Sequence, residues 1–163
     1  MGKVAERELT VGNDTAYLSE VRNAVLELLG DGPFPPAEAQ LVALAVDEAV
    51  ANVMEHAYSG QQFGPDCRIR IRLAIAETQF EVRIHDTGKR FDPNSVPDVD
   101  IQEHVRQGRR GGLGIFLIRR IMDVVDYRFE AGPRNELRLV KFVDNSPDKA
   151  KSGKLKRQAK RSR

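Results

Sequence analysis

The stretch from Leu41 to Tyr58 places the strongest constraint on what this chain can fold into. It runs for about five helical turns without Gly or Pro, so its composition predicts one continuous helix. At about 100° per residue, one face of this helix is apolar and able to pack on a sheet. That face holds Val42, Val46, Val50, Val53 and Ala57, and the solvent-facing side is expected to hold Asp47, Ala51 and Glu55.

A row of polar side chains runs along the edge of the apolar face. Glu48, Asn52 and His56 recur at i, i+4 and i+8, beside Leu41 and Ala45. Such groups need partners, because burying a polar group without a hydrogen bond is costly, and Asn is a poor residue in mid-helix. A divalent metal bound through the Asn oxygen, with a carboxylate four residues away to orient a nucleophile, would provide them. Solvent or a neighbouring loop could do so as well.

In segments outside this helix, polar and apolar residues alternate, as they do in half-buried strands. Residues 67–76 alternate arginine with isoleucine or leucine, and residues 80–85 continue the alternation, which predicts an antiparallel hairpin turning at Glu77 and Thr78. One face should meet the helices and the arginine face should meet water. Further strands are expected at 8–11, 127–130 and 136–143, the last two joined at Gly132-Pro133.

Two more helices are expected. Asn13 or Asp14 can cap a helix that ends near Leu29, with Gly30 to Pro36 separating it from the central helix. Its apolar stripe is Tyr17, Leu18, Val21, Val25 and Leu28. Residues 113–125 read as a buried helix that opens on a glycine cluster. The long, mostly polar connection over 86–111 is of the kind that often acts as a lid.

Composition excludes several classes of protein. The 163 residues suffice for one domain, and no apolar run approaches the ~20 residues that span a membrane. The N-terminus lacks the apolar core of a signal peptide. Cys67 is the only cysteine, so no disulfide can form within the chain and a cytoplasmic location is expected. The three histidines lack zinc-type spacing, so we expect no structural metal.

The charge is distributed unevenly along the chain. Residues 148–163 hold eight Lys or Arg against one Asp, a net charge of +7, whereas residues 1–147 carry −5. We therefore expect a mildly acidic domain over 1–147 and a basic, disordered tail over 148–163. The tail could contact nucleic acid or an acidic partner, or could serve only to increase solubility.

Two short motifs suit a nucleotide. A helix that begins in Gly111-Gly-Leu-Gly114 offers unpaired backbone N–H groups and a positive dipole end to an anion, and Arg109 and Arg110 precede it. Taken alone, these glycines could equally form an ordinary turn. Asp86, at the end of a strand and before Thr87-Gly88, can accept a hydrogen bond from an exocyclic amine such as that of adenine. It could instead form an Asx turn.

In order and spacing, these elements resemble the Bergerat-fold ATPase superfamily, which includes DNA gyrase, the 90-kDa heat-shock chaperones, MutL-type repair proteins and sensor histidine kinases. The segment Glu48-Ala-Val-Ala-Asn52, with His56, resembles its N box. Asp86-Thr-Gly88 and Gly111-Gly-Leu-Gly114 resemble its two glycine boxes. Over roughly residues 8–143 the similarity narrows to the bacterial anti-sigma-factor serine kinases. It implies a two-layer α+β sandwich, with helices on one face of a mixed, mostly antiparallel sheet and a lid over the nucleotide at 92–110.

The resemblance also implies a role for each motif residue. Glu48 would be the general base or water-orienting carboxylate, and Asn52 would bind Mg²⁺. The nucleotide-binding residues would be Asp86 and Gly88 at the adenine, and Arg110, Gly111, Gly112, Leu113 and Gly114 at the phosphates. There are two departures: Arg90 occupies a position that is usually glycine, and Asn135-Glu136 stands where a Thr often lies near the adenine.

The implied function is that of an ATP- and Mg²⁺-dependent serine-protein kinase. By resemblance, it would phosphorylate an anti-anti-sigma protein of the STAS type, bind a sigma factor and form a homodimer, without contact with a membrane. Two alternatives stay open. One is a nucleotide-gated binding module without turnover, which Arg90 favours and Glu48 disfavours. The other is the detached ATPase half of a histidine kinase, which would need a second polypeptide to carry the phosphoacceptor.

Overall fold

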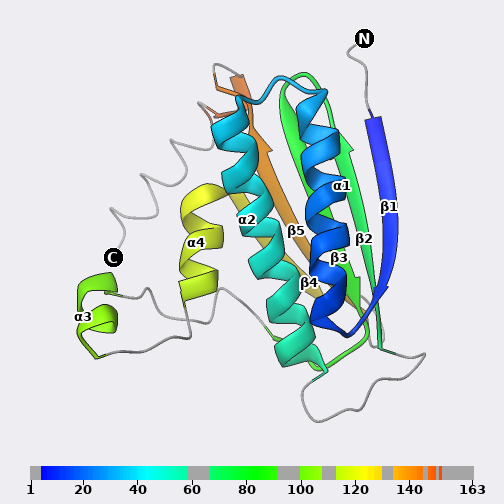
Figure 1. The fold of residues 1–163 in the computed structure, drawn as a ribbon, viewed down its shortest axis with the longest axis vertical. Coiled ribbons are helices and arrows are strands. Elements are labelled where there is room, and N and C mark those ends of the chain that lie inside the picture. The colour runs from blue at the N-terminus through cyan, green and yellow to red at the C-terminus, as the bar shows by residue number, and fades with distance from the viewer. Residues whose placement is uncertain are drawn as a thin grey trace.

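Five antiparallel strands form one sheet in the order β1-β2-β3-β5-β4, and α1, α2 and α4 cover one of its faces (Figure 1). The computed structural model describes residues 5–58, 67–91, 100–107, 113–129, 134–144, 147–149 and 151. The strands are β1 (Ala5–Gly12), β2 (Arg68–Ile75), β3 (Gln79–Asp86), β4 (Val124–Phe129) and β5 (Asn135–Phe142). The expected two-layer α+β fold is confirmed, and every strand pair that the structure describes is antiparallel.

The alternating pattern of β2 places its two kinds of side chain on opposite faces of the sheet. The apolar side chains of Ile69, Ile71, Leu73 and Ile75 are buried beneath the helices. Arg68, Arg70 and Arg72 are exposed on the open face, as the sequence predicted. The hairpin to β3 closes where the N–H of Ala76 donates to the carbonyl of Gln79 (2.9 Å).

The helices are α1 (Leu18–Gly30), α2 (Pro36–Asn52), α3 (Ile101–Arg106) and α4 (Leu113–Ile121). Asp14 caps the 3₁₀ turn at Thr15–Tyr17 that leads into α1, and its Oδ1 accepts from the N–H of Ala16 (2.9 Å). Tyr17 was expected in the apolar stripe but is 41% exposed, because this 3₁₀ turn precedes the regular helix.

The central helix differs from the prediction in its last turn. The α-helix ends at Asn52 and continues as a π-helical turn over Val53–Ala57, followed by Tyr58. The wider turn changes the angular spacing of the side chains, and π-helical turns occur frequently at functional sites. Glu48 and Asn52 therefore lie on regular helix, while His56 lies on the π turn.

Asp47 was expected to face solvent, and this prediction is wrong. Its side chain is buried because α1 packs against that side of α2, and Nε of Arg22 on α1 donates to its Oδ2 (2.5 Å). Burial raises the pKa of Asp47, against the opposing hydrogen bond and charge of Arg22. The Asp47 carboxylate thus links α2 to α1 at the residue that precedes Glu48.

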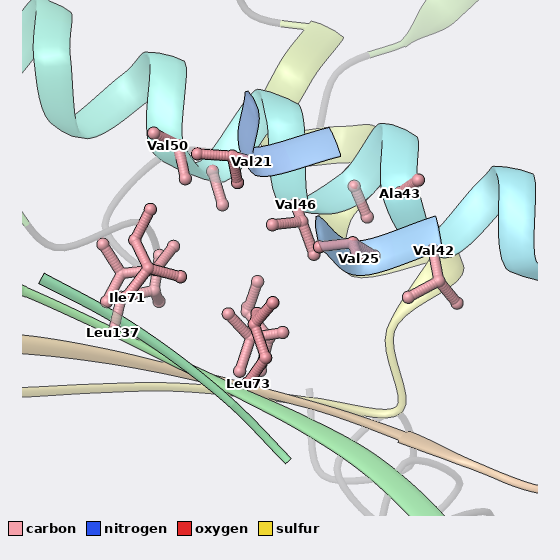
Figure 2. Packing of buried hydrophobic residues seen from close by; sticks show 14 of the residues in the cluster. Val21, Val25, Val42, Ala43, Val46, Val50, Ile71, Leu73 and Leu137 are labelled. Atoms are coloured by element: carbon pink, nitrogen blue, oxygen red, sulfur yellow. The ribbon is translucent and has the colours of Figure 1, made fainter. Parts of the chain in front are cut away.

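The core lies between the helices and the covered face of the sheet. Figure 2 shows valines of α1 and α2 pointing toward Ile71, Leu73 and Leu137, which rise from the strands. The predicted apolar face of the central helix is confirmed, since Val42, Val46, Val50, Val53 and Ala57 are all buried. Packing of this face fixes the rotation of α2, and therefore the direction of its polar row.

The last predicted helix was too long. α4 ends at Ile121 and β4 begins at Val124, although the pattern predicted helix to residue 125. Tertiary pairing explains the difference, because Asp123 donates its N–H to Val140 (2.8 Å) and accepts from the N–H of Phe142 (2.9 Å), both on β5. The expected turn at 132–133 lies outside the described residues.

The C-terminal segment is described only in part. Residues 147–149 and 151 are helical, although disorder was expected from residue 148, and the rest of the basic segment at 148–163 lies outside the described residues. Within the part of the chain that the structure describes, no helix combines the length and apolar character needed to cross a membrane.

Candidate functional site

The start of α4 lies directly against the polar row of α2. A Cβ atom added to Gly114 would lie 2.6 Å from Oε2 of Glu48 and 3.5 Å from Nδ2 of Asn52. Glycine at 114 therefore leaves the space that the Glu48 carboxylate occupies. The structure brings together three residues that the sequence assigned to two separate motifs, on two helices that are far apart in the chain.

Asp86 ends β3 as a buried carboxylate, with only 4% of the residue exposed. Its Oδ1 accepts from the N–H of Gly88 (2.9 Å), which is an Asx turn, and from Nδ2 of Asn135 (2.8 Å). The Asx-turn interpretation is therefore confirmed. It leaves room for a binding role, because Oδ2 accepts no hydrogen bond from the described residues and Asp86 lines a pocket.

Burial raises the pKa of the Asp86 carboxyl above its ordinary value. Hydrogen bonds from Asn135 and from the N–H of Gly88 oppose this rise, as does the neighbouring His85. One oxygen of this buried carboxylate is open to accept a hydrogen bond. A neutral donor such as an amine N–H suits it, because a donated hydrogen bond stabilises the ionised form of the carboxyl group.

Gly88 is required by a close approach of two backbones. A Cβ at this position would lie 2.3 Å from the carbonyl oxygen of Ala57, at the end of the π-helical turn. The neighbouring N–H of Lys89 donates to the same oxygen (2.7 Å). The turn after β3 is thereby attached to the end of the central helix, which gives a structural reason for the glycine besides the expected passage near a base.

Aromatic side chains hold the same junction. The hydroxyl of Tyr58 donates to the carbonyl of Arg68 (3.2 Å) and accepts from the N–H of Thr87 (3.1 Å). The rings of His56 and Phe91 stack with centroids 4.5 Å apart. These contacts connect the end of the central helix to β2 and to both ends of the turn after β3. The sequence showed no sign of them beyond the presence of aromatic residues.

One pocket is lined by residues of two of the motifs, Asn52 and Asp86. Its walls come from α2, the π turn, β3, α4, β4 and β5, and are mostly apolar. The lining residues include Asn52, Ala57, Asp86, Lys89, Phe91, Ile115, Arg119, Tyr127 and Leu137. Asn52 and Asp86 thus share one pocket, while Glu48 and Gly114 lie in contact beside Asn52.

The other predicted site residues are placed only in part. Leu113 is half-buried as the first residue of α4. Arg110, Gly111 and Gly112 lie outside the described residues, as does most of the expected lid at 92–110, of which α3 is described. Arg90, at the usual glycine position, places its guanidinium 4.6 Å from the ring centroid of Phe129.

The residues present fit a nucleotide and a cation. Asp86 is the one carboxylate among the described residues that line this mostly apolar pocket, the pattern expected of a site that orients a flat, partly polar ring. The Asn52 carboxamide lies beside the space left open by Gly114, and an amide oxygen is a suitable ligand for Mg²⁺.

Comparison with known proteins gives concordant results. The histidine kinase-like ATPase domain family matches residues 11–141. The serine-protein kinase RsbW of Listeria monocytogenes is 36% identical over 93 residues, which are 55% of this chain and 57% of that protein. RsbW of Halalkalibacterium halodurans is 28% identical over 151 residues, or 86% of this chain and 88% of the relative.

A solved structure shares the fold. In the SiaB–SiaC complex from Pseudomonas aeruginosa, one chain superposes with a TM-score of 0.57 at 19% identity, covering 82% of this chain and 88% of its own length. This protein spans little more than half the length of the first curated relatives it matches, 57% for the Listeria kinase. The family match, in contrast, includes every strand and helix that forms the pocket. The chain therefore belongs to the histidine kinase-like ATPase domain family, and within it resembles the anti-sigma-factor serine-protein kinases.

Proposed function

We propose that this protein is an ATP- and Mg²⁺-dependent serine-protein kinase that also acts as an anti-sigma factor. Its substrate would be a serine on an anti-anti-sigma protein of the STAS type, and its second partner a sigma factor. Family membership and the RsbW relatives support the use of ATP and a kinase activity. The particular partners, a homodimeric state and a cytoplasmic location are part of the proposal.

The observation that carries this proposal is the contact between Gly114 and the side chains of Glu48 and Asn52. Phosphoryl transfer needs positioning and charge stabilisation more than covalent chemistry. A carboxylate, a carboxamide and the N-terminal end of a helix meet at one place, and the pocket containing Asp86 begins beside them.

Each residue then has a distinct task. Glu48 would accept or orient the proton of the attacking serine hydroxyl. The carboxamide oxygen of Asn52 would hold Mg²⁺, which supplies charge neutralisation at the phosphates when it is bound. The N–H groups of Gly111, Gly112, Leu113 and Gly114 would bind the phosphates together with Arg110. Asp86 would accept a hydrogen bond from the adenine amino group, and Gly88 would pass close to the base.

The test is direct phosphorylation. The purified protein is mixed with Mg²⁺, labelled ATP and a STAS-domain protein from the same organism, and phosphoserine is measured in the acceptor. We expect transfer that stops when Mg²⁺ is chelated. Asn52→Ala should lower both the Mg²⁺-dependent affinity for ATP and the transfer rate, and an unchanged affinity would remove Asn52 from the metal site.

A second candidate function is a binding module that sequesters its partner without turnover. Arg90 favours it, because the position is usually glycine in related ATPases, and here the side chain is engaged with Phe129. The same assay separates the two functions, since tight binding of the acceptor without transfer would support the binding module. Transfer to histidine on a separate polypeptide would instead identify the ATPase half of a histidine kinase.

A further inference from the structure

A buried amide lies beside the Asp86 carboxylate that lines the pocket. Asn135, the first residue of β5, is the registered partner of Asp86 on β3 and is 1% exposed. Its Nδ2 donates both to Oδ1 of Asp86 (2.8 Å) and to the carbonyl of Gly88 (3.0 Å). One side chain therefore holds the carboxylate and the following turn in a fixed relation.

Chemistry fixes which way this amide points. If the Asn135 amide were rotated by 180°, its oxygen would face two acceptors, the Asp86 carboxylate and the Gly88 carbonyl, and both hydrogen bonds would become repulsive. Nδ2 must therefore face them, and Oδ1 faces the other way. That Oδ1 atom is buried and has no hydrogen-bond donor among the described residues.

The arrangement determines what Asp86 can offer to a ligand. Two donors, the N–H of Gly88 and Nδ2 of Asn135, both engage Oδ1. This leaves Oδ2 as an acceptor and prevents the carboxylate from rotating without loss of two hydrogen bonds. Among the described residues, Oδ2 of Asp86 and Oδ1 of Asn135 have no hydrogen-bond donor, and both are acceptors. Of the two residues, Asp86 lines the pocket. A ligand group that donates to Oδ2 of Asp86 is stabilised, whereas one that only accepts leaves this oxygen unpaired.

We propose that Asn135 is a positioning residue that sets the base selectivity of the pocket, by holding Asp86 so that it selects a 6-amino purine over a 6-oxo purine. The proposal rests on the proposed function, in which Asp86 binds the base. It assigns a role to a residue at which this chain departs from the Thr often found in related ATPases.

The next residue along β5 provides a matched control. Glu136 is also buried, at 5% exposed, but it belongs to the opposite face of the sheet and bonds Nε2 of His85 (2.8 Å). Glu136→Gln keeps a hydrogen-bonding side chain of the same size and perturbs the same strand. It should leave the choice between bases unchanged, whatever it does to stability.

The test compares ATP with inosine triphosphate, whose base carries a 6-oxo group in place of the 6-amino group and a hydrogen on N1. Calorimetry with non-hydrolysable analogues should show that the wild type prefers the adenine form. Asn135→Leu removes the donor and keeps the same number and branching of side-chain heavy atoms. We expect its affinity for the adenine analogue to fall about tenfold or more, while affinity for the inosine analogue changes less than about twofold. Asn135→Thr, which retains one donor, should restore part of the preference.

Each outcome decides the matter. An equal loss for both analogues would mean a structural role only, and an unchanged ratio would remove Asn135 from base selection. If Asn135→Leu does not fold, the ratio in Asn135→Thr decides, and a wild-type ratio there overturns the proposal. If the wild type transfers phosphate normally but the Asn135 variants keep its ratio of affinities for the two analogues, this inference alone is contradicted. A wild type that binds neither analogue contradicts the proposed function as well.

Discussion

The substitution Gly114→Ala should reduce the proposed phosphoryl transfer much more than it changes the stability of the fold. The new Cβ would lie 2.6 Å from Oε2 of Glu48, whereas ordinary contact begins at about 3.4 Å, so the carboxylate must move by about 0.8 Å. The Asn52 amide, at 3.5 Å, can stay where it is. The atom that moves is the far end of a flexible side chain, so the displacement should be inexpensive.

The free energies nearly cancel. Forcing Glu48 off its preferred rotamer costs about 0.5–1.5 kcal/mol, and replacing Gly by Ala inside a helix contributes up to about 1 kcal/mol. The free energy of unfolding should therefore change by less than about 1 kcal/mol. Phosphoryl transfer should fall by about tenfold to a hundredfold, because displacement of a catalytic group by about 1 Å can have that effect.

Thermal unfolding, calorimetry with ATP and a transfer assay check this together. The variant should melt near the wild-type temperature and transfer slowly. Adding Gly114→Ala to Glu48→Gln should cause little further loss of rate, since both changes act through one carboxylate. Wild-type transfer by Gly114→Ala, or a fully additive double variant, would refute the reasoning.

Three other predictions concern the surroundings of the site. Gly88→Ala should destabilise the protein strongly, because its Cβ would meet backbone atoms at 2.3 Å, whereas Gly30→Ala, with nothing within 4 Å, should not; denaturant unfolding compares the two. Burial raises the pKa of Asp86, so ATP affinity measured by calorimetry should begin to weaken on acidification above the ordinary carboxyl value of 3.8, and weakening only below 3.8 would contradict this. For the same reason, the stability that this group contributes is present at low pH and is lost as the pH rises through the raised pKa. Arg22→Ala leaves the buried Asp47 carboxylate unpaired and should lower the free energy of unfolding by about 1–3 kcal/mol, a loss that a double variant with Asp47→Ala should partly recover.

The sequence predicted the sheet and its covered face well, because alternation over residues 67–76 has only one interpretation when one face is buried. It also predicted the valine face of α2, since a period near 3.6 residues belongs to helix and not to strand. The N-terminal cap at Asp14 followed from local chemistry. These features depend on neighbours in the chain, which a sequence displays directly.

What the sequence could not predict depends on partners far away in the chain. Asp47 looked solvent-exposed on a helical wheel, but Arg22 of α1 lies against it. The end of α4 is set by pairing of Asp123 with β5, and local propensity would have extended the helix. Asn135 was visible as a departure from a family pattern, yet its contact with Asp86 required the register of β3 on β5.

The central claim, that Glu48 serves phosphoryl transfer, is tested most directly by Glu48→Gln. The amide keeps the shape of the side chain and most of its helix propensity but cannot accept or orient a proton as a carboxylate does. With Mg²⁺, labelled ATP and a STAS-domain acceptor, we expect ATP binding close to wild type and transfer reduced by about a hundredfold or more. Transfer as fast as wild type would show that Glu48 has another role.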